Sequence, residues 1–236
     1  MISKPIEHQF EFWTHLGNVG GYIHQYDGYT SLLPLTGEWP SKIYNLQNAN
    51  IAQLKTNILE CDLPNSIALD AEDKLNLNLE KQGFTKKSVV EGMSLKVKSN
   101  MTFKESSNIT EVVDQIGIQC FANIASEAFG YNIDSASIIG LLKNDRTQLY
   151  LRKYKDQFVS CGILFLDIKG DSGLHMIGVN KKHRGLGLGK EMTQHLLFNA
   201  LKNQSENIHL VASKFGAPIY KNYGFLNKGY LNSYTL

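Results

Sequence analysis

A basic, glycine-rich turn over residues 180–190 carries the clearest chemical signal in the sequence. It follows an apolar stretch, Leu174–Val179, and contains glycine at alternate positions, namely Gly185, Gly187 and Gly189. Glycine allows tight bends and lets backbone N–H groups approach a ligand closely. A helix that begins within the turn would add unpaired N–H donors and the positive end of its dipole. The pattern therefore predicts an anion-binding turn, suited to a phosphorylated cofactor.

Residue spacing excludes two common phosphate-binding motifs. The dinucleotide fingerprint needs GxGxxG and an acidic residue after the next strand, whereas the spacing here is GxGxG and the next strand ends in Ala212-Ser213. A P-loop needs four residues between its first glycine and its Gly-Lys pair, followed by Ser or Thr. Here three residues separate Gly185 from Gly189, and Glu191 follows the lysine. A different kind of phosphate turn is indicated.

Hydrophobic periodicity and turn residues predict the elements that position this turn. Helices are expected over 7–16, 50–61, 71–82, 109–129, 134–143, 188–202 and 216–222, and strands over 22–25, 41–46, 66–69, 89–97, 148–152, 158–168, 174–179, 208–212 and 225–236. The glycine-containing turn 169–173 predicts a hairpin. The order of elements indicates an α/β fold with a mixed sheet. A polar segment over 98–108 predicts a domain boundary near residue 100.

The turn resembles the acetyl-CoA-binding motif of the GNAT superfamily of acyl-CoA-dependent N-acyltransferases. The matching pattern is Val179-x-x-x-x-Arg184-Gly185-x-Gly187-x-Gly189. Lysine stands where the family often has a proline after the strand, which is a minor departure. The resemblance implies a mixed, mostly antiparallel sheet flanked by helices, with acetyl-CoA as cosubstrate and no metal.

A second segment supports the same family. Tyr220-x-x-x-Gly224-Phe225 resembles the tyrosine-x-x-x-glycine-phenylalanine segment of GNAT proteins, and a predicted strand lies between the two motifs. The resemblance covers residues 110–236, and its order of elements agrees with the order expected above. Two motifs in the right order are more specific than either alone.

The resemblance also implies cofactor contacts. Backbone groups near Ile177, Gly178 and Val179 would bind the pantetheine arm. Ser213 matches a position where the family often has an asparagine on that arm, although it also suits the N-cap of the next helix. The expected pyrophosphate contacts are N–H groups from Arg184, Gly185, Leu186, Gly187, Leu188, Gly189 and Lys190.

In the family an amine attacks the thioester directly, and a tyrosine assists the departing thiolate; Tyr220 holds that position. Many members carry a glutamate base six residues before the valine, where this sequence has Gly173. Alternation along a strand predicts that Gly173, His175 and Ile177 share a face, so His175 is a candidate base, directly or through water. The alternative is a histidine with a purely structural role.

The first hundred residues resemble the C-terminal motif. Residues 79–84 align with 220–225, and both end in Gly-Phe, which indicates a tandem repeat with a degenerate first copy. The expected domains are 1–100, without a CoA loop, and 101–236, the acetyltransferase. Leu79 replaces the tyrosine, and no glycine lies between Gly37 and Gly83, so the first copy is predicted to bind no CoA.

Composition limits the partners. The net charge of +2 is too small to suggest nucleic acid or an anionic membrane as the main partner, and no apolar run approaches the length of a membrane span. The three cysteines are far apart, which suggests neither a disulfide framework nor a zinc site, and a cytoplasmic protein is expected. The GNAT resemblance implies an acceptor that is a primary amine of a small molecule or peptide; the alternative is a non-catalytic acyl-CoA-binding module.

Overall fold

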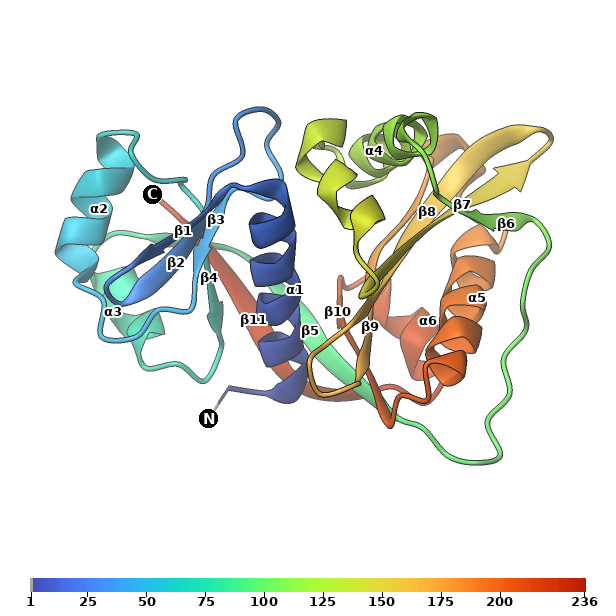
Figure 1. Cartoon of the computed structure of the whole chain (residues 1–236). Helices are drawn as coiled ribbons and strands as arrows, with labels where there is room; N and C mark the ends of the chain where they lie inside the picture. The colour runs from blue at the N-terminus through green and yellow to red at the C-terminus, as the bar shows by residue number, and fades with distance from the viewer. Residues whose placement is uncertain (1) are drawn as a thin grey trace. The chain divides into compact units, whose positions relative to one another are not determined.

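The computed structural model describes residues 2–236, which form two compact units (Figure 1). The first unit comprises residues 2–35, Pro40–Ser94 and Val211–Leu236, and the second comprises Thr36–Trp39 and Leu95–Leu210. The last segment of the chain therefore packs with the N-terminal unit. The boundary predicted near residue 100 would separate two copies of one fold. That division differs from the division into these two units, and it stays a prediction.

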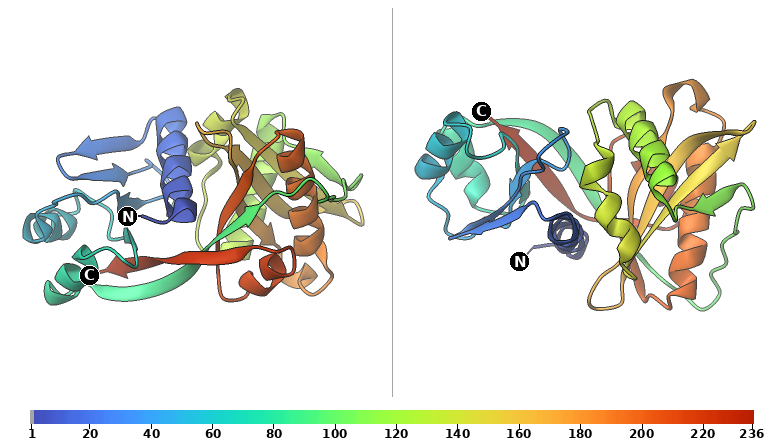
Figure 2. Two further views of the ribbon diagram at one scale, coloured as in Figure 1. Left: turned by 90° about the horizontal axis from the view of Figure 1, so that it is seen from below. Right: turned by 45° about the horizontal axis from the view of Figure 1, so that its top comes forward.

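The first unit has a sheet in the order β1-β2-β3-β4-β11-β5. Strands β3 and β4 pair in parallel, and the other neighbours are antiparallel. The C-terminal strand β11 lies between β4 and β5, as Figure 2 shows. The elements are α1 (Lys4–Gly20), β1 (Ile23–Tyr26), β2 (Tyr29–Leu32), β3 (Lys42–Tyr44), α2 (Ile51–Leu59), β4 (Ile67–Asp70), α3 (Leu75–Lys81), most of β5 (Thr85–Lys96), α6 (Ala217–Lys221) and β11 (Leu226–Thr235).

The second unit has a sheet in the order β10-β9-β8-β7-β6, in which only β9 and β10 pair in parallel. Helices α4 and α5 cover opposite faces of this sheet (Figure 1). The elements are β6 (Ile109–Glu111), α4 (Gln115–Phe129), the 3₁₀ turns η1 (Ser135–Ser137) and η2 (Ile139–Lys143), β7 (Thr147–Tyr154), β8 (Gln157–Leu166), β9 (Ser172–Val179), η3 (Lys181–His183), α5 (Leu188–Lys202) and most of β10 (Asn207–Ala212).

Two glycines show which helix covers which face of the second unit's sheet. A Cβ atom at Gly162 would meet Met192 and Leu196 of α5, at 3.0 Å each. A Cβ atom at Gly178 would instead meet the Cβ of Ala128 in α4 at 2.9 Å. Both helices thus pack directly on the backbone of the central strands, and a side chain at either position would require the helix residues facing it to shift.

The predicted α/β class with a mostly antiparallel mixed sheet is confirmed, and helix α5 has the predicted bounds. The predicted helix 109–129 is wrong at its start, because Ile109–Glu111 pairs with β7 as an edge strand. Helix α4 begins only after Asp114, whose carboxylate accepts the Gly117 N–H at 2.7 Å and caps the helix. The predicted helix 134–143 is instead the pair of 3₁₀ turns η1 and η2, and strand β2 was not predicted.

Candidate acetyl-CoA site

The glycine turn has the backbone geometry that its sequence predicts. Gly185 and Gly187 adopt left-handed conformations, with φ of 80° and 78°, and Gly187 is the N-cap residue of α5. A Cβ atom at either position would meet nothing within 4 Å. Glycine is therefore required here by backbone conformation, and the space in front of the turn is open to a ligand.

The turn presents backbone donors at the start of α5. The first bond of the helix runs from the Glu191 N–H to the Gly187 carbonyl at 3.0 Å, so the N–H groups of Leu188 and Gly189 precede the intrahelical pattern. The side chain of Leu188 is 3% exposed and anchors the turn, whereas Gly185 and Gly187 are exposed. This arrangement is suited to a pyrophosphate.

Side chains fix the turn to the end of α4. The Arg184 guanidinium donates from Nη2 to the Ala128 carbonyl at 2.7 Å and from Nε to the Val179 carbonyl at 3.4 Å. The Lys181 N–H donates to Oε1 of Glu127 at 3.0 Å. The Arg184 side chain thus holds protein carbonyls and orients the turn, a role that the motif alone did not indicate.

Strands β9 and β10 diverge beside this turn. They pair only at Ser172 with Ile208 and at Gly173 with His209. From Leu174 to the end of β9, no strand within residues 2–236 pairs with the β10-facing edge. Backbone groups of this edge can bind an extended ligand in the manner of an added strand.

A β-bulge lies in the part of β9 that pairs with β8 but not with β10. Gly178 pairs with Cys161 of β8 and His175 pairs with Ile163, so β9 has one extra residue between these pairs. Met176 has a φ of 51° within the bulge, which is unusual for a residue with a side chain. A bulge leaves a residue outside the ladder, and here the Met176 carbonyl accepts from the Cys161 thiol at 3.5 Å. No sequence signal pointed to Met176.

The bulge corrects the predicted face of His175. Because of the extra residue, His175 and Gly178 lie on the same face, and the alternation that joined His175 to Ile177 is wrong. His175 lies on the face covered by α4, where its ring contacts Phe165 with a centroid distance of 6.1 Å. The side chain is 6% exposed. Its role as a base stays a prediction.

The other two predicted site residues lie in the first unit. Tyr220 is in α6, where its ring packs edge-on against Phe225, and its pKa is raised to about 12 by burial. The Ser213 hydroxyl accepts the Gly216 N–H at 3.2 Å and so stabilises the turn before α6. The roles of both residues at the cofactor rest on their positions in the motif and stay predictions.

Glu191, in the first turn of α5, is paired within the protein. Its carboxylate accepts from Nη2 of Arg152 at 2.9 Å, from Nε of the same residue at 3.0 Å, and from the Ser106 hydroxyl at 2.6 Å. Burial alone would raise the pKa of Glu191, but hydrogen bonds from Ser106 and Arg152 outweigh burial and lower it. Arg152 thus compensates the negative charge of Glu191, which reduces the repulsion between Glu191 and a phosphate bound at the turn.

We expect Glu191→Gln to lower the free energy of unfolding by about 2 kcal/mol, because it removes the carboxylate that compensates the charge of the buried Arg152. Solvent screening of the partly exposed Glu191 keeps the loss below that of a fully buried pair. Since folding lowers the pKa of Glu191, its contribution is present above pH 4.5 and is lost as the pH falls below that value. Urea unfolding at pH 7 and pH 3.5 measures both effects.

The control for this prediction is Glu105→Gln. Glu105 pairs with Lys202 at 3.7 Å, and both side chains are 57% exposed. This change should alter the free energy of unfolding by no more than about 0.5 kcal/mol. Equal stability of the two variants at pH 7 would show that the Arg152–Glu191 pair does not stabilise the start of α5.

Across residues 2–236, no three His, Cys, Asp or Glu side chains are grouped so that they could hold a metal ion. None of the helices in that part of the chain combines the length and apolar character needed to cross a membrane.

The chain is similar to several solved structures. It matches the GCN5-related N-acetyltransferase from Kribbella flavida with a TM-score of 0.70 and 16% identity, over 94% of this chain and 92% of that one. It matches the GCN5-related N-acetyltransferase from Sphaerobacter thermophilus with a TM-score of 0.60 and 13% identity, over 88% and 76% of the two chains. These identities show a shared fold. No curated protein matches the sequence.

A sequence model of a protein family also matches this chain. The model described as an acetyltransferase (GNAT) domain matches residues 109–231, which is more than half of the chain and includes the glycine turn, the bulged strand and the C-terminal Gly-Phe segment. The residues that resemble GNAT motifs therefore lie inside the matched region, in the geometry described above. The chain belongs to the GNAT acetyltransferase family.

Proposed function

We propose that the protein transfers an acetyl group from acetyl-CoA to a primary amine of a small molecule or peptide, by direct attack in a ternary complex. The observation that carries this proposal is that β9 loses its pairing with β10 beyond Gly173 and then leads into the exposed Gly185–Gly187 turn. Family membership supports the same activity. Acetyl-CoA would supply the acyl group as a thioester.

The residues present fit this cosubstrate. Backbone groups of Ile177, Gly178 and Val179 would bind the amides of the pantetheine arm, since this edge of β9 has no strand partner. N–H groups of the turn, from Gly185 to Lys190, would hold the pyrophosphate at the start of α5, whereas the predicted Arg184 N–H donates to the Lys181 carbonyl at 3.4 Å. The backbone freed by the bulge at Met176 would supply an N–H for the developing oxyanion.

Positioning is the main contribution that the protein makes to the reaction. Holding an amine near the reacting carbon lowers the activation free energy by about 7 kcal/mol or more, when the atoms lie in an attacking geometry. The amine must be neutral to attack, so one group must take its proton. We assign this role to His175, acting directly or through water, because Gly173 occupies the position of the usual glutamate.

Tyr220 would assist the departing thiolate. Its pKa of about 12 lies above the ordinary thiol pKa of about 8.5, so complete proton transfer would cost about 5 kcal/mol. A hydrogen bond from the phenol to the thiolate avoids this cost. We therefore propose that Tyr220 acts as a hydrogen-bond donor, and that solvent completes the protonation.

The competing function is that of a non-catalytic acyl-CoA-binding module, which the absence of a carboxylate at Gly173 favours. The test is release of free CoA from acetyl-CoA in the presence of a panel of primary amines and lysine-containing peptides. We expect amine-dependent release, and we expect His175→Asn to slow it about 100-fold without changing the acetyl-CoA dissociation constant. Acetyl-CoA binding without release by any acceptor would favour the module.

A further inference from the structure

The first unit repeats the plan of the acetyl-CoA site. In β3-α2-β4-α3-β5, as in β9-α5-β10-α6-β11, two parallel strands flank a helix, and a short helix then leads through Gly-Phe into an antiparallel strand. The Gly-Phe turns agree in detail. Gly83 and Gly224 have φ of 90° and 89°. The next N–H, from Phe84 or Phe225, donates back to Leu79 or Tyr220 at 3.1 and 3.2 Å.

The parallel strands of this first copy also diverge. Strands β3 and β4 pair only at Ile43 with Ile67. A cavity of about 700 Å³ opens where the two strands end, a volume typical of small-molecule sites. Its walls come from the segment after β3 (residues 45–48), the end of β4 (Leu69 and Asp70) and the turn into α3 (residues 72–75). The cavity thus lies at the ends of the two diverging strands that correspond to β9 and β10 in the second copy.

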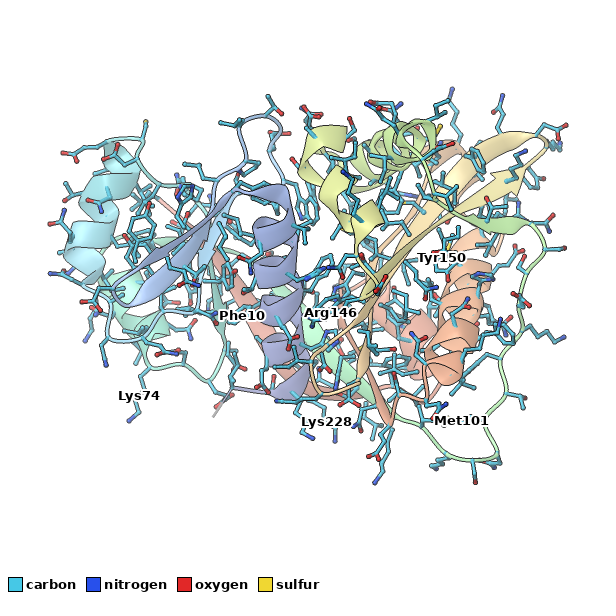
Figure 3. All side chains as sticks on the ribbon, viewed as in Figure 1. Phe10, Lys74, Met101, Arg146, Tyr150 and Lys228 are labelled. Carbon is cyan, nitrogen blue, oxygen red and sulfur yellow. The ribbon has the colours of Figure 1, made fainter. Side chains whose placement is uncertain are left out.

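The chemistry of this cavity differs from that of the glycine turn. Residues 45–48 read Asn-Leu-Gln-Asn, so the segment after β3 has no glycine with which to bring backbone donors to a phosphate. The wall carries three carboxylates against one ammonium, from Asp70, Glu72, Asp73 and Lys74. Lys74 is exposed and extends from the edge of the unit in Figure 3. An anionic ligand such as CoA would be repelled.

Two of the carboxylates are held in place by the backbone. Asp70 is 5% exposed, and its oxygens accept the N–H groups of Ser3 at 3.0 Å and Glu72 at 2.9 Å. Oδ1 of Asp73 accepts the Leu75 N–H at 2.8 Å. The rest of the lining includes the apolar side chains of Phe10, Leu46 and Leu69, which are 5%, 5% and 2% exposed. Because these three apolar side chains are almost fully covered, the cavity offers fixed negative charge beside only a small apolar surface.

We propose that this cavity is a second ligand site, which binds a small organic cation with a short apolar chain and does not bind CoA. The amide side chains of Asn45, Gln47 and Asn48 provide further hydrogen-bonding groups at its wall. The ligand's ammonium group would lie against the carboxylates, and its chain would lie on the apolar lining. The site does not depend on acetyl transfer.

The test compares three ligands of equal length and different charge, namely hexylammonium, 1-hexanol and hexanoate, on the full chain labelled with ¹⁵N. Backbone amide shifts locate binding. We expect hexylammonium to shift residues 45–48 and 72–75 saturably, at least about tenfold more tightly than hexanoate, because the wall repels the anion. CoA should shift residues 184–190 and leave the cavity residues unchanged.

Two variants with a matched control test the source of the affinity. Glu72→Gln removes a wall charge and should weaken hexylammonium binding about threefold, and Gln47→Trp should fill the cavity and abolish binding. Glu60→Gln, a change of the same type at an exposed residue outside the lining, should leave binding unchanged. The proposal is overturned if hexylammonium gives no saturable shift at these residues, if hexanoate binds equally well, or if CoA binds there.

Discussion

Replacing Gly187 with valine should weaken acetyl-CoA binding by at least about 100-fold while the protein still folds. Gly187 has a φ of 78°, where a β-branched residue costs about 1–2 kcal/mol or more. The new side chain would also project into the open space in front of the turn, where the exposed donors meet a ligand. Isothermal titration with acetyl-CoA measures the loss.

The matched control for this change is Gly170→Val in the hairpin between β8 and β9. Gly170 has a φ of 87°, and a Cβ atom there would also meet nothing within 4 Å. The two variants therefore introduce similar backbone strain, and the midpoint temperature of thermal unfolding should fall by similar amounts in both. Only Gly187→Val should lose affinity for acetyl-CoA. If both variants bind it as the unmodified protein does, the turn is not the pyrophosphate site.

The second large effect is expected for Tyr220→Phe, which should lower kcat about 100-fold and leave the acetyl-CoA dissociation constant unchanged. The substitution keeps the ring, which packs against Phe225, and removes the hydroxyl that we propose to donate to the thiolate. The same CoA-release assay gives kcat, and titration gives the dissociation constant. A parallel loss of turnover and affinity would show that Tyr220 shapes the binding site instead.

Tyr223→Phe is the control for Tyr220→Phe. Tyr223 lies three residues further along the same Gly-Phe segment, outside the family's tyrosine position, so its loss should change kcat less than about twofold. Because the pKa of Tyr220 is about 12, its ionisation should not reduce kcat between pH 7 and pH 10. A fall in kcat over that range, absent from Tyr220→Phe, would contradict the role proposed for this phenol.

Much of the glycine turn was predictable because its signals are local. Left-handed conformations at Gly185 and Gly187 follow from residue type and spacing, and the bounds of α5 follow from an amphipathic period next to those glycines. The repeated Gly-Phe turn was visible in the same way, as two short segments with matching order. Signals of this kind need no knowledge of distant residues.

Other predictions failed where distant pairing decides the structure. Alternation along β9 was interrupted by a bulge whose extra residue, near Met176, is defined only by the register with β8. The segment at Ile109 became a strand because β7 offers it an edge, although its own periodicity suits a helix. Local patterns cannot show register, because register depends on two segments at once.

The sequence by itself determined the family motifs, the glycine turn and the helix that follows it, since each depends on neighbouring residues. Only the tertiary structure decided that β9 and β10 part after Gly173, that Arg184 binds the end of α4, and that β11 pairs between β4 and β5. It likewise revealed the cavity between the ends of β3 and β4. These features arise from contacts between segments far apart in the chain, whose geometry is set by the packing of the whole sheet.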